Sequence, residues 1–275
     1  MLTGGDAPDG YGGAMTAAAT STLRTVRAVR YVLALREGGS LPGIVEADDL
    51  GTYVLKFRGA GQGLLALVAE VVTGELARRL GLPVPELVLA ELDSGLASAE
   101  PDEEVQDLIR ASHGLNLGMD FLPGSLGIER PDGVDAGLAA QVVWFDALVL
   151  NVDRSWRNPN LLRWHGRPYL IDHGAALYFH HDWSGAGTVP TRAYPAPRDH
   201  VLMPVAGPIA DAQALLAPQL SAEMLDEVLG LVPDEWLQVD DVAGRRAAYR
   251  DLLLARAAQA DSWLPALEVA RASYL

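Results

Sequence analysis

The sequence predicts a two-lobed α+β protein in which an antiparallel sheet with one helix precedes a mainly helical half. The chain has 275 residues, of which 49% are hydrophobic, and can therefore bury a large core. Strand patterns dominate before residue 123 and helix patterns dominate after it. We expect a flexible tail at residues 1–22, an N-terminal lobe at 23–122 and a C-terminal lobe at 123–275.

The first lobe is predicted to consist of strands with one long helix between them. The strand GTYVLKFRG at 51–59 has one apolar face and one charged face, which suits an antiparallel sheet beside a cleft. A helix is expected at 64–80, because Arg78 and Arg79 complete its last turn and Gly81 follows. The other elements expected here are strands at 23–35, 86–92 and 115–125, and an acidic surface segment with a short helix at 93–107.

The second lobe is predicted to be helical apart from one hairpin. The helix at 135–150 is very apolar towards its end, VVWFDALVL. The stretches LLRW and PYLID are separated by the turn HGR and predict two short paired strands. From about residue 209 the pattern is helical to the end, with breaks at Pro218 and Pro233.

The composition excludes several classes of protein. With 21 Lys and Arg against 36 Asp and Glu, the net charge is −15, so general binding to nucleic acid is not expected. The absence of cysteine excludes disulfides, thiolate metal sites and cysteine nucleophiles. No apolar run reaches about 18 residues, so we expect no membrane span and a soluble, cytoplasmic protein.

Lys56 is the only lysine in the chain, and it lies on the charged face of the predicted strand at 51–59. A lysine ammonium is a compact point charge that suits a phosphate group. Glu70 lies inside the apolar run LLALVAEVV of the next helix, and a buried carboxylate needs a partner. Lys56 is the obvious candidate for that partner.

Three further polar residues follow apolar segments in the second lobe. Asp153 and Asn158 occupy the loop after the apolar helix, and Asp172 ends the strand PYLI. Carboxylate and amide oxygens suit Mg²⁺, which proteins usually hold with one or two carboxylates plus substrate phosphates. A second aspartate nearby can accept a proton from an incoming hydroxyl. Each residue alone could also be a turn or strand-end residue.

Two other kinds of site remain open from the residues alone. The turn GAGQG between a strand and a helix weakly favours dinucleotide binding, although Leu64 stands where that fingerprint has its third glycine. A second possibility is a metal site formed by His173 with His180, His181 and Asp182, but the adjacent His180 and His181 would point to opposite faces of an extended segment. A metal hydrolase would use His173, His180 and Asp172.

The motifs VLKF, LVAEVV, NVDRSWRN, IDHG and ELARRLGLPVPELV resemble the HipA-like branch of the protein-kinase-like superfamily, which is related to the phosphoinositide lipid kinases. The resemblance covers residues 23 to 183 and implies a two-lobed protein-kinase-like fold. It also implies ATP and Mg²⁺ as cofactors and phosphoryl transfer to a hydroxyl, with serine or threonine of a protein as the first expectation.

The resemblance implies a role for each candidate residue. Asp153, Lys56 and Glu70 are expected to be catalytic, and Asn158 and Asp172 to bind the metal. Lys56 is also expected to contact the nucleotide. The other expected nucleotide contacts are Gly38, Gly39 and Ser40 of REGGSLPG, and Asp120 and Phe121 at the junction of the lobes.

The chain also departs from related families. IDHG replaces the Asp-Phe-Gly of ordinary kinases, so a phenylalanine-based inactive state is not expected. The chain is shorter than HipA toxins and lacks their N-terminal extension, so a DNA-binding antitoxin partner is not expected. A small-molecule or lipid hydroxyl remains open as the acceptor, and a nucleotide-binding pseudokinase remains open as an alternative.

Overall fold

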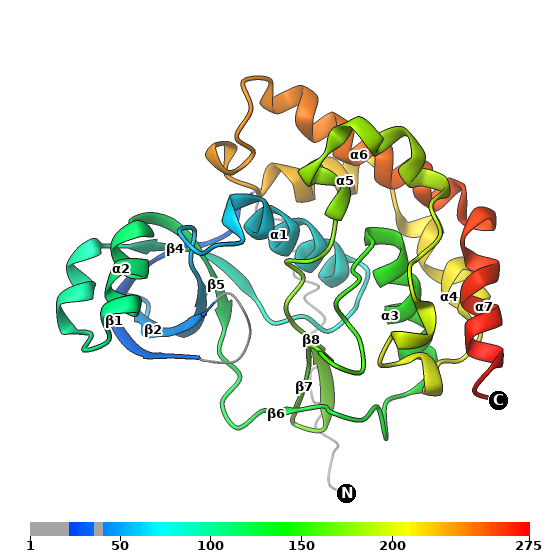
Figure 1. Cartoon of the computed structure of the whole chain (residues 1–275), viewed down its shortest axis with the longest axis horizontal. Coiled ribbons are helices and arrows are strands. Elements are labelled where there is room, and N and C mark those ends of the chain that lie inside the picture. Colours follow the sequence, from blue (N-terminus) through cyan, green and yellow to red (C-terminus); the bar gives the residue numbers. More distant parts are fainter. Residues whose placement is uncertain (1–21, 36–40) are drawn as a thin grey trace, which may run out of the picture.

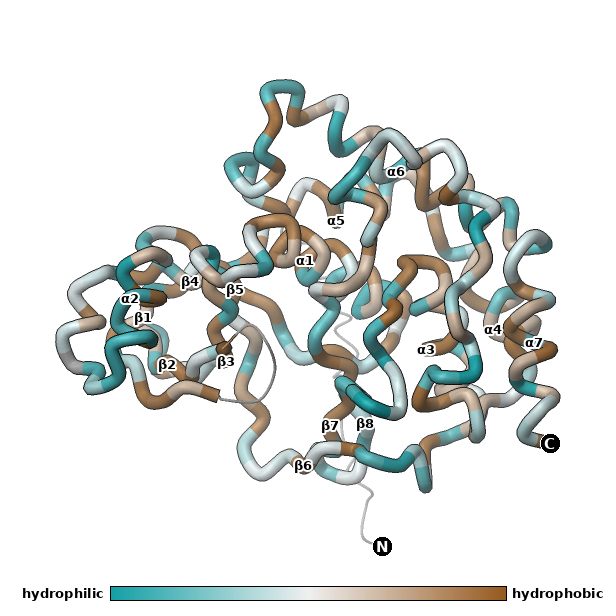
Figure 2. Tube along the Cα trace, in the orientation of Figure 1, coloured by the Kyte–Doolittle hydropathy of each residue, from teal (hydrophilic) through white to brown (hydrophobic). Residues whose placement is uncertain are grey.

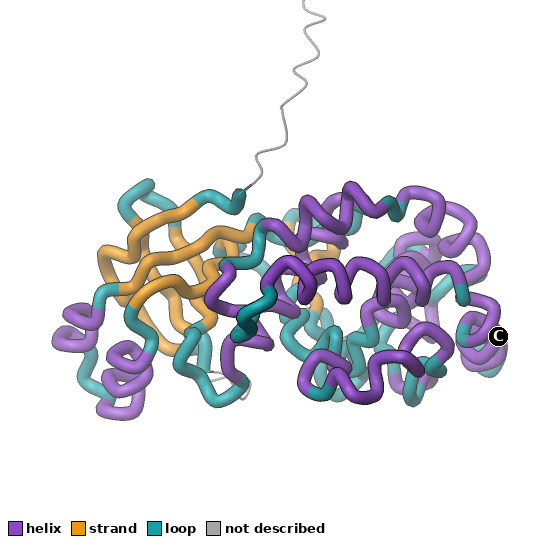
Figure 3. Tube along the Cα trace, turned by 90° about the horizontal axis from the view of Figure 1, so that it is seen from above, coloured by secondary structure: helices purple, strands orange, loops and turns teal. Residues whose placement is uncertain are grey.

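The computed structural model of the protein describes residues 22–35 and 41–275. Strands gather at one end of the molecule and helices at the other (Figures 1 and 3). The sheet at the first end is a closed barrel with strand order β1-β2-β3-β5-β4. Its strands are β1 (Thr25–Ala34), β2 (Gly43–Ala47), β3 (Thr52–Lys56), β4 (Leu87–Leu92) and β5 (Gly114–Asp120).

The barrel corrects the prediction of a purely antiparallel sheet. Residues 25–27 of β1 pair in parallel with β4, whereas residues 28–34 pair antiparallel with β2. The register shifts twice along the β1–β2 pairing, and such bulges bend a strand and increase its twist. The bend lets one long strand serve two neighbours and close the barrel. Strand β2 was not predicted.

The short helix expected in the acidic segment at 93–107 is present and extends beyond that segment. Helix α2 (Glu103–Ala111) begins at Asp102, whose side chain accepts a hydrogen bond from the backbone N–H of Glu104. Its apolar residues Val105 and Ile109 are buried with Leu55 and Ala90 in the core of the barrel. The short helix expected in the acidic segment therefore covers the barrel and helps to fill it.

Helix α1 (Gly63–Arg79) packs mainly with the helical end of the molecule. It is apolar around most of its circumference, and its residues Val68 and Val72 share one hydrophobic core with Phe145 and Leu225. Its surface is joined to the helical end by an ion pair between Arg79 and Glu227. Figure 2 shows hydrophobic stretches of the trace in both α1 and α3.

The second half holds the remaining helices and a small sheet, as expected except for β6. Strands β6, β7 and β8 form an antiparallel sheet in that order. None of the helices in the described part of the chain has the length and apolar character needed to cross a membrane. The elements are β6 (Leu126–Gly127), α3 (Ala136–Val149), β7 (Leu161–Trp164), β8 (Arg167–Leu170), α4 (Ile209–Leu216), α5 (Ala222–Gly230), α6 (Val242–Ala258) and α7 (Leu264–Ala272).

Candidate functional site

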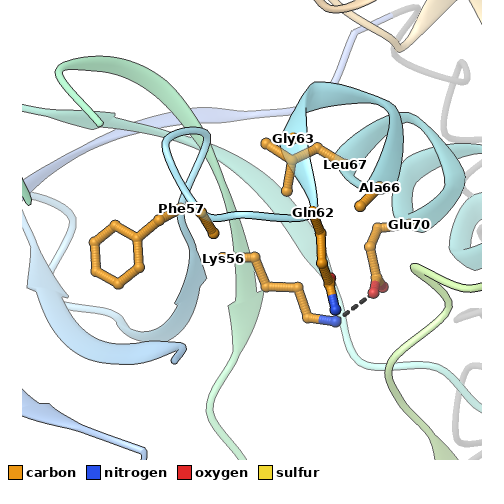
Figure 4. A pocket seen from close by; sticks show the side chains of 8 residues that line it. Lys56, Phe57, Gln62, Gly63, Ala66, Leu67 and Glu70 are labelled. Atoms are coloured by element: carbon orange, nitrogen blue, oxygen red, sulfur yellow. Dashed lines mark hydrogen bonds and ion pairs between the residues drawn. The ribbon is translucent and has the colours of Figure 1, made fainter. Parts of the chain in front are cut away.

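Three predicted site residues meet where the barrel adjoins the helical end. The Lys56 ammonium, at the end of β3, forms an ion pair with the Glu70 carboxylate of α1 (Figure 4). It donates a second hydrogen bond to Asp172 Oδ1, at 2.6 Å. The side chain of Glu70 is 4% exposed and that of Asp172 is 40% exposed. One end of this cluster is therefore sealed and the other opens to solvent.

This environment shifts the pKa values of the Glu70 and Asp172 carboxylates in opposite directions. Burial raises the pKa of Glu70 to about 7, although Lys56 acts in the opposite direction. Burial acts to raise the pKa of Asp172 as well, but Lys56 outweighs it and lowers that pKa to about 2. Burial alone would lower the pKa of Lys56, yet the two acids hold it above its usual value. The lysine is therefore a fixed cation and Asp172 a fixed anion.

The backbone after β8 places Asp172 in a strained conformation. Its φ is 54°, in the left-handed region that non-glycine residues seldom adopt. The strand itself is held by a hydrogen bond from the Leu170 N–H to the carbonyl of Pro83, just after α1. Gly174 follows closely, and a Cβ there would lie 3.1 Å from Glu70 Oε1. Glycine at this position lets the backbone pass beside the buried glutamate.

Asp153 lies on the loop after α3, as predicted, and is held by two asparagines. Asn158 Nδ2 donates to Asp153 Oδ2 at 2.7 Å, and Asn160 Nδ2 donates to the same oxygen at 3.3 Å. The Asp153 N–H donates to Asn151 Oδ1 at 3.3 Å. The carboxylate is therefore oriented by hydrogen bonds, and the carbonyl oxygen of the exposed Asn158 amide is free for another partner.

Arg154 connects this loop to Asp172, and its role was not predicted. Its side chain is fully buried. Nε donates to Asp146 Oδ2 at 2.7 Å, and Nη1 donates to the carbonyls of Asn160 and Ile171. Nη2 contacts His173 Nδ1 at 3.2 Å. One guanidinium therefore fixes the residues that precede and follow Asp172 relative to the loop that carries Asp153.

Asp146 is the carboxylate at the centre of this buried network. It also accepts a hydrogen bond from Asn151 Nδ2 at 3.1 Å, and His200 Nε2 lies 3.0 Å from its Oδ2. Burial acts to raise its pKa, but Arg154 and His200 outweigh burial, so the pKa lies below its usual value. Burial, with Arg154 beside it, lowers the pKa of His173 to about 3 and keeps this imidazole neutral.

Apolar residues of the barrel share the face that carries Lys56. In the antiparallel ladder Val54 lies opposite Met119 and Lys56 lies opposite Leu117, so these side chains point to one side of the sheet. A separate recess beside Lys56 is lined by residues such as Phe57, Gln62 and Glu70 but has a volume of only about 10 Å³ (Figure 4). Alternation along the strand at 51–59 already placed Val54 beside Lys56, whereas Met119 could be found only from the register.

The other predicted nucleotide contacts stay predictions. Gly38, Gly39 and Ser40 lie outside the described residues. The N–H of Asp120 donates to the carbonyl of Glu86 and that of Phe121 donates to the carbonyl of Thr52, so neither backbone donor is available to a base. The backbone groups at this junction also include the two carbonyls, so the contact of Asp120 and Phe121 with the base stays a prediction.

The structure supports neither of the two alternative sites, the histidine metal site and the dinucleotide-binding turn. His173 contacts Arg154, whereas His180 Nδ1 lies 3.0 Å from the hydroxyl of Tyr249 on α6. Within the described ranges, no three His, Cys, Asp or Glu side chains form a metal-binding group. The strand before GAGQG pairs antiparallel on both sides, whereas dinucleotide-binding folds are built on parallel strands. The histidine site and the dinucleotide site therefore lack their structural basis.

The fold and the site together define a protein of the kinase-like class. A sheet-rich N-terminal region precedes a helical remainder, and a strand lysine is paired with a helix glutamate beside a strand-end aspartate. A sequence profile of the HipA-like kinase family matches residues 29–263. The chain belongs to the HipA-like kinase family.

A solved structure with a TM-score above 0.5 shares the fold of this chain. The crystal structure of the Helicobacter pylori proinflammatory kinase CtkA matches with a TM-score of 0.51 and 12% identity, covering 91% of this chain and 99% of that one. Golgi casein kinase matches with a TM-score of 0.44 and 13% identity, over 90% of this chain and 73% of that one. Its structure with Mn and ADP bound gives the same score and identity over 88% and 73%. No curated protein sequence matches the chain.

Proposed function

We propose that the protein is an ATP-dependent, Mg²⁺-requiring kinase that transfers the γ-phosphate to a hydroxyl, with serine or threonine of a protein as the acceptor. The observation that carries the proposal is the position of Lys56 between Glu70 and Asp172, which come from separate segments of the chain. Strained backbone at Asp172 is also typical of functional sites.

The proposal treats residues 23–122 and 123–275 as two lobes with the nucleotide between them. Val54 and Met119 would contact the adenine, because they lie on the same face of the sheet as Lys56. Lys56 would bind the phosphates on the side that faces Asp172, since the recess on its other side has room for about one water molecule. Glu70 would hold the ammonium in place.

The residues present fit a Mg²⁺ site that is completed by phosphate oxygens. Asp172 is ionised and partly exposed, and the Asn158 carbonyl oxygen is free. Such a site needs only one or two protein oxygens, so the absence of a larger carboxylate cluster among the described residues is compatible with it. When bound, the ion would neutralise charge on the phosphates.

Asp153 would accept the proton of the acceptor hydroxyl. The new bond joins the hydroxyl oxygen to the γ-phosphorus, the bond from that phosphorus to the bridging oxygen breaks, and ADP leaves. The asparagines around Asp153 would keep its carboxylate oriented towards the acceptor. Arg154 would keep Asp153 and Asp172 in a fixed relation without touching the substrate.

The first test is transfer of labelled γ-phosphate from ATP with Mg²⁺ to the protein itself and to a serine- and threonine-rich acceptor protein. We expect Asp153→Ala to reduce transfer by about 10²–10⁴-fold, the range for loss of a general base. Asp261→Ala removes an exposed carboxylate that is not among the proposed site residues and should match the wild type. Equal labelling by the wild type and Asp153→Ala would contradict the role of Asp153.

Thermal melting tests the nucleotide separately from transfer. ATP with Mg²⁺ at about 100 times its Kd should raise the melting temperature by on the order of 5–10 °C, because binding stabilises the folded state by about 2.7 kcal/mol. NADH should give no shift, and Asp172→Asn should lose the part of the ATP shift that requires Mg²⁺. An ATP shift without any labelling would favour a pseudokinase, and a shift with NADH alone would contradict the proposal.

A further inference from the structure

The loop between α3 and β7, which carries Asp153, is paired with a segment from a later part of the chain. The Trp156 N–H donates to the carbonyl of Asp199 at 2.9 Å, and the Val201 N–H donates to the carbonyl of Arg154 at 3.3 Å. These backbone hydrogen bonds hold the middle of the loop in place. The start of the loop is held by a side chain of the same later segment.

That side chain is Tyr194. Its hydroxyl donates a hydrogen bond to the backbone carbonyl of Asn151 at 2.6 Å. Tyr194 is 4% exposed and Asn151 is fully buried. Because both residues are shielded from solvent, water cannot readily replace the hydroxyl, and the carbonyl would lose a hydrogen bond if the hydroxyl were removed.

Asn151 connects this hydroxyl to Asp153. Asn151 Oδ1 accepts a hydrogen bond from the Asp153 N–H at 3.3 Å. The Asn151 N–H donates to the carbonyl of Asp146 at 2.8 Å, and its Nδ2 donates to Asp146 Oδ1 at 3.1 Å. The orientation of one residue is thus shared between the buried network around Asp146, the Tyr194 hydroxyl and the backbone of Asp153.

The position of Tyr194 is itself fixed by a buried arginine of α6. Arg256 Nη1 donates to the carbonyls of Val189 and Arg192, at 2.7 and 2.8 Å. Its Nε and Nη2 both donate to the carbonyl of Ala147, in the last turn of α3, at 3.0 and 2.7 Å. The residues just before Tyr194 are therefore tied to the helix end from which the Asp153 loop begins, and the hydroxyl is preorganised relative to that loop.

From these contacts we infer that Tyr194 is a positioning residue for phosphoryl transfer: its hydroxyl fixes the Asn151 peptide and thereby the Asp153 carboxylate. The inference rests on the proposed function and adds to it a residue that acts through Asp153. A misplacement of about 1 Å can cost a reaction on the order of 100-fold in rate. The proposed phosphate contact, Lys56, belongs to another element, so ATP binding should not depend on this hydroxyl.

The test is Tyr194→Phe, which removes the hydroxyl and keeps the ring. Transfer of labelled γ-phosphate from ATP with Mg²⁺ to the serine- and threonine-rich acceptor protein should show kcat lowered roughly tenfold and KM for ATP within about twofold of wild type. The melting temperature should fall by on the order of 5 °C. Circular dichroism at the assay temperature gives the folded fraction, and rates are expressed per folded protein.

Tyr249→Phe is the matched control for lost stability. Tyr249 is also fully buried, and its hydroxyl lies 3.0 Å from Nδ1 of His180, which is not a residue of the Asp153 loop. This variant should melt at a similarly lowered temperature, yet its kcat should match the wild type. In an Asp153→Ala background, Tyr194→Phe should change the residual transfer by less than about twofold, because the group that it positions is gone.

The outcomes separate the inference from the proposed function. A wild type that labels neither itself nor the acceptor protein would overturn the proposed function and the inference with it. A wild type that transfers phosphate no faster than Tyr194→Phe would overturn the inference alone. The same holds if Tyr194→Phe and Tyr249→Phe lose equal activity, or if Tyr194→Phe still lowers transfer tenfold when Asp153 is already replaced by alanine.

Discussion

Replacing Lys56 by methionine is expected to reduce phosphoryl transfer by on the order of 10²–10³-fold, because the phosphates lose a preorganised cation. The same change should destabilise the protein. It leaves Glu70 almost fully buried without its cation, and breaking a buried pair costs about 3–5 kcal/mol. Both effects can be measured on one preparation of the protein: circular dichroism melting gives the stability, and the labelling assay gives the phosphoryl transfer.

The loss of stability should also depend on pH in a defined direction. The pKa of Glu70 is raised from 4.5 to about 7 in the folded protein, so its contribution to stability falls as pH rises between those values. Without Lys56 the pKa rises further, and the free energy of unfolding should keep falling above pH 7, by up to about 1.4 kcal/mol per pH unit.

The control for this pH dependence is the double variant Lys56→Met with Glu70→Gln. Glutamine cannot ionise, so the fall in stability above pH 7 should disappear while transfer remains lost. Urea unfolding of the single and the double variant at pH 6, 7, 8 and 9 measures the free energy of unfolding. A single variant whose stability is flat from pH 7 to 9 would show that the Glu70 carboxylate does not depend on Lys56.

Arg154→Met is expected to lower the free energy of unfolding by about 3–5 kcal/mol, because Asp146 is left as a buried charge without its main partner. It also removes the donors that hold the carbonyls of Asn160 and Ile171, so transfer should fall with it. For a chain of this size the melting temperature should drop by on the order of 10 °C.

Two further variants serve as controls for Arg154→Met. Arg157→Met changes the arginine that follows three positions later but is 63% exposed, and it should alter stability by less than about 0.5 kcal/mol. Arg154→Lys retains a charge but cannot make the same planar set of hydrogen bonds, and it should fall between wild type and Arg154→Met. Similar stabilities for Arg154→Met and Arg157→Met would contradict the importance assigned to the buried network.

The sequence predicted those parts of the fold that depend on local pattern. The alternation around Lys56 and the apolar run around Glu70 identified β3 and α1, and the hairpin before Asp172 was found from its turn. The barrel closure was not predicted, because it depends on bulges in β1 and on a parallel pairing with β4 that leave no local signal. Strand β2 is short and precedes an acidic turn, so it was missed.

The sequence predicted the ion pair of the site, but it did not predict the buried Arg154 that holds the surrounding loops in place. Glu70 was expected to pair with Lys56, and it does, whereas the contact between Asp172 and Lys56 was not predicted. Arg154 follows Asp153 in a polar stretch typical of an exposed loop, and nothing adjacent to it shows that it is buried. The available signal was Asp146, a carboxylate in the apolar run VVWFDALVL that requires a cation from elsewhere.

The placement of α1 has a consequence for how activity could be controlled. A helix that swings away from its sheet can separate lysine from glutamate and so act as an off switch. Here α1 shares the large apolar interior with α3 and α5, and moving it would expose Val68, Val72 and Leu76 to water. The Lys56–Glu70 pair is thus set once, when the chain folds. For the proposed kinase, control would then act on protein abundance, on nucleotide supply or on access of the acceptor, while the Lys56–Glu70 ion pair stays intact.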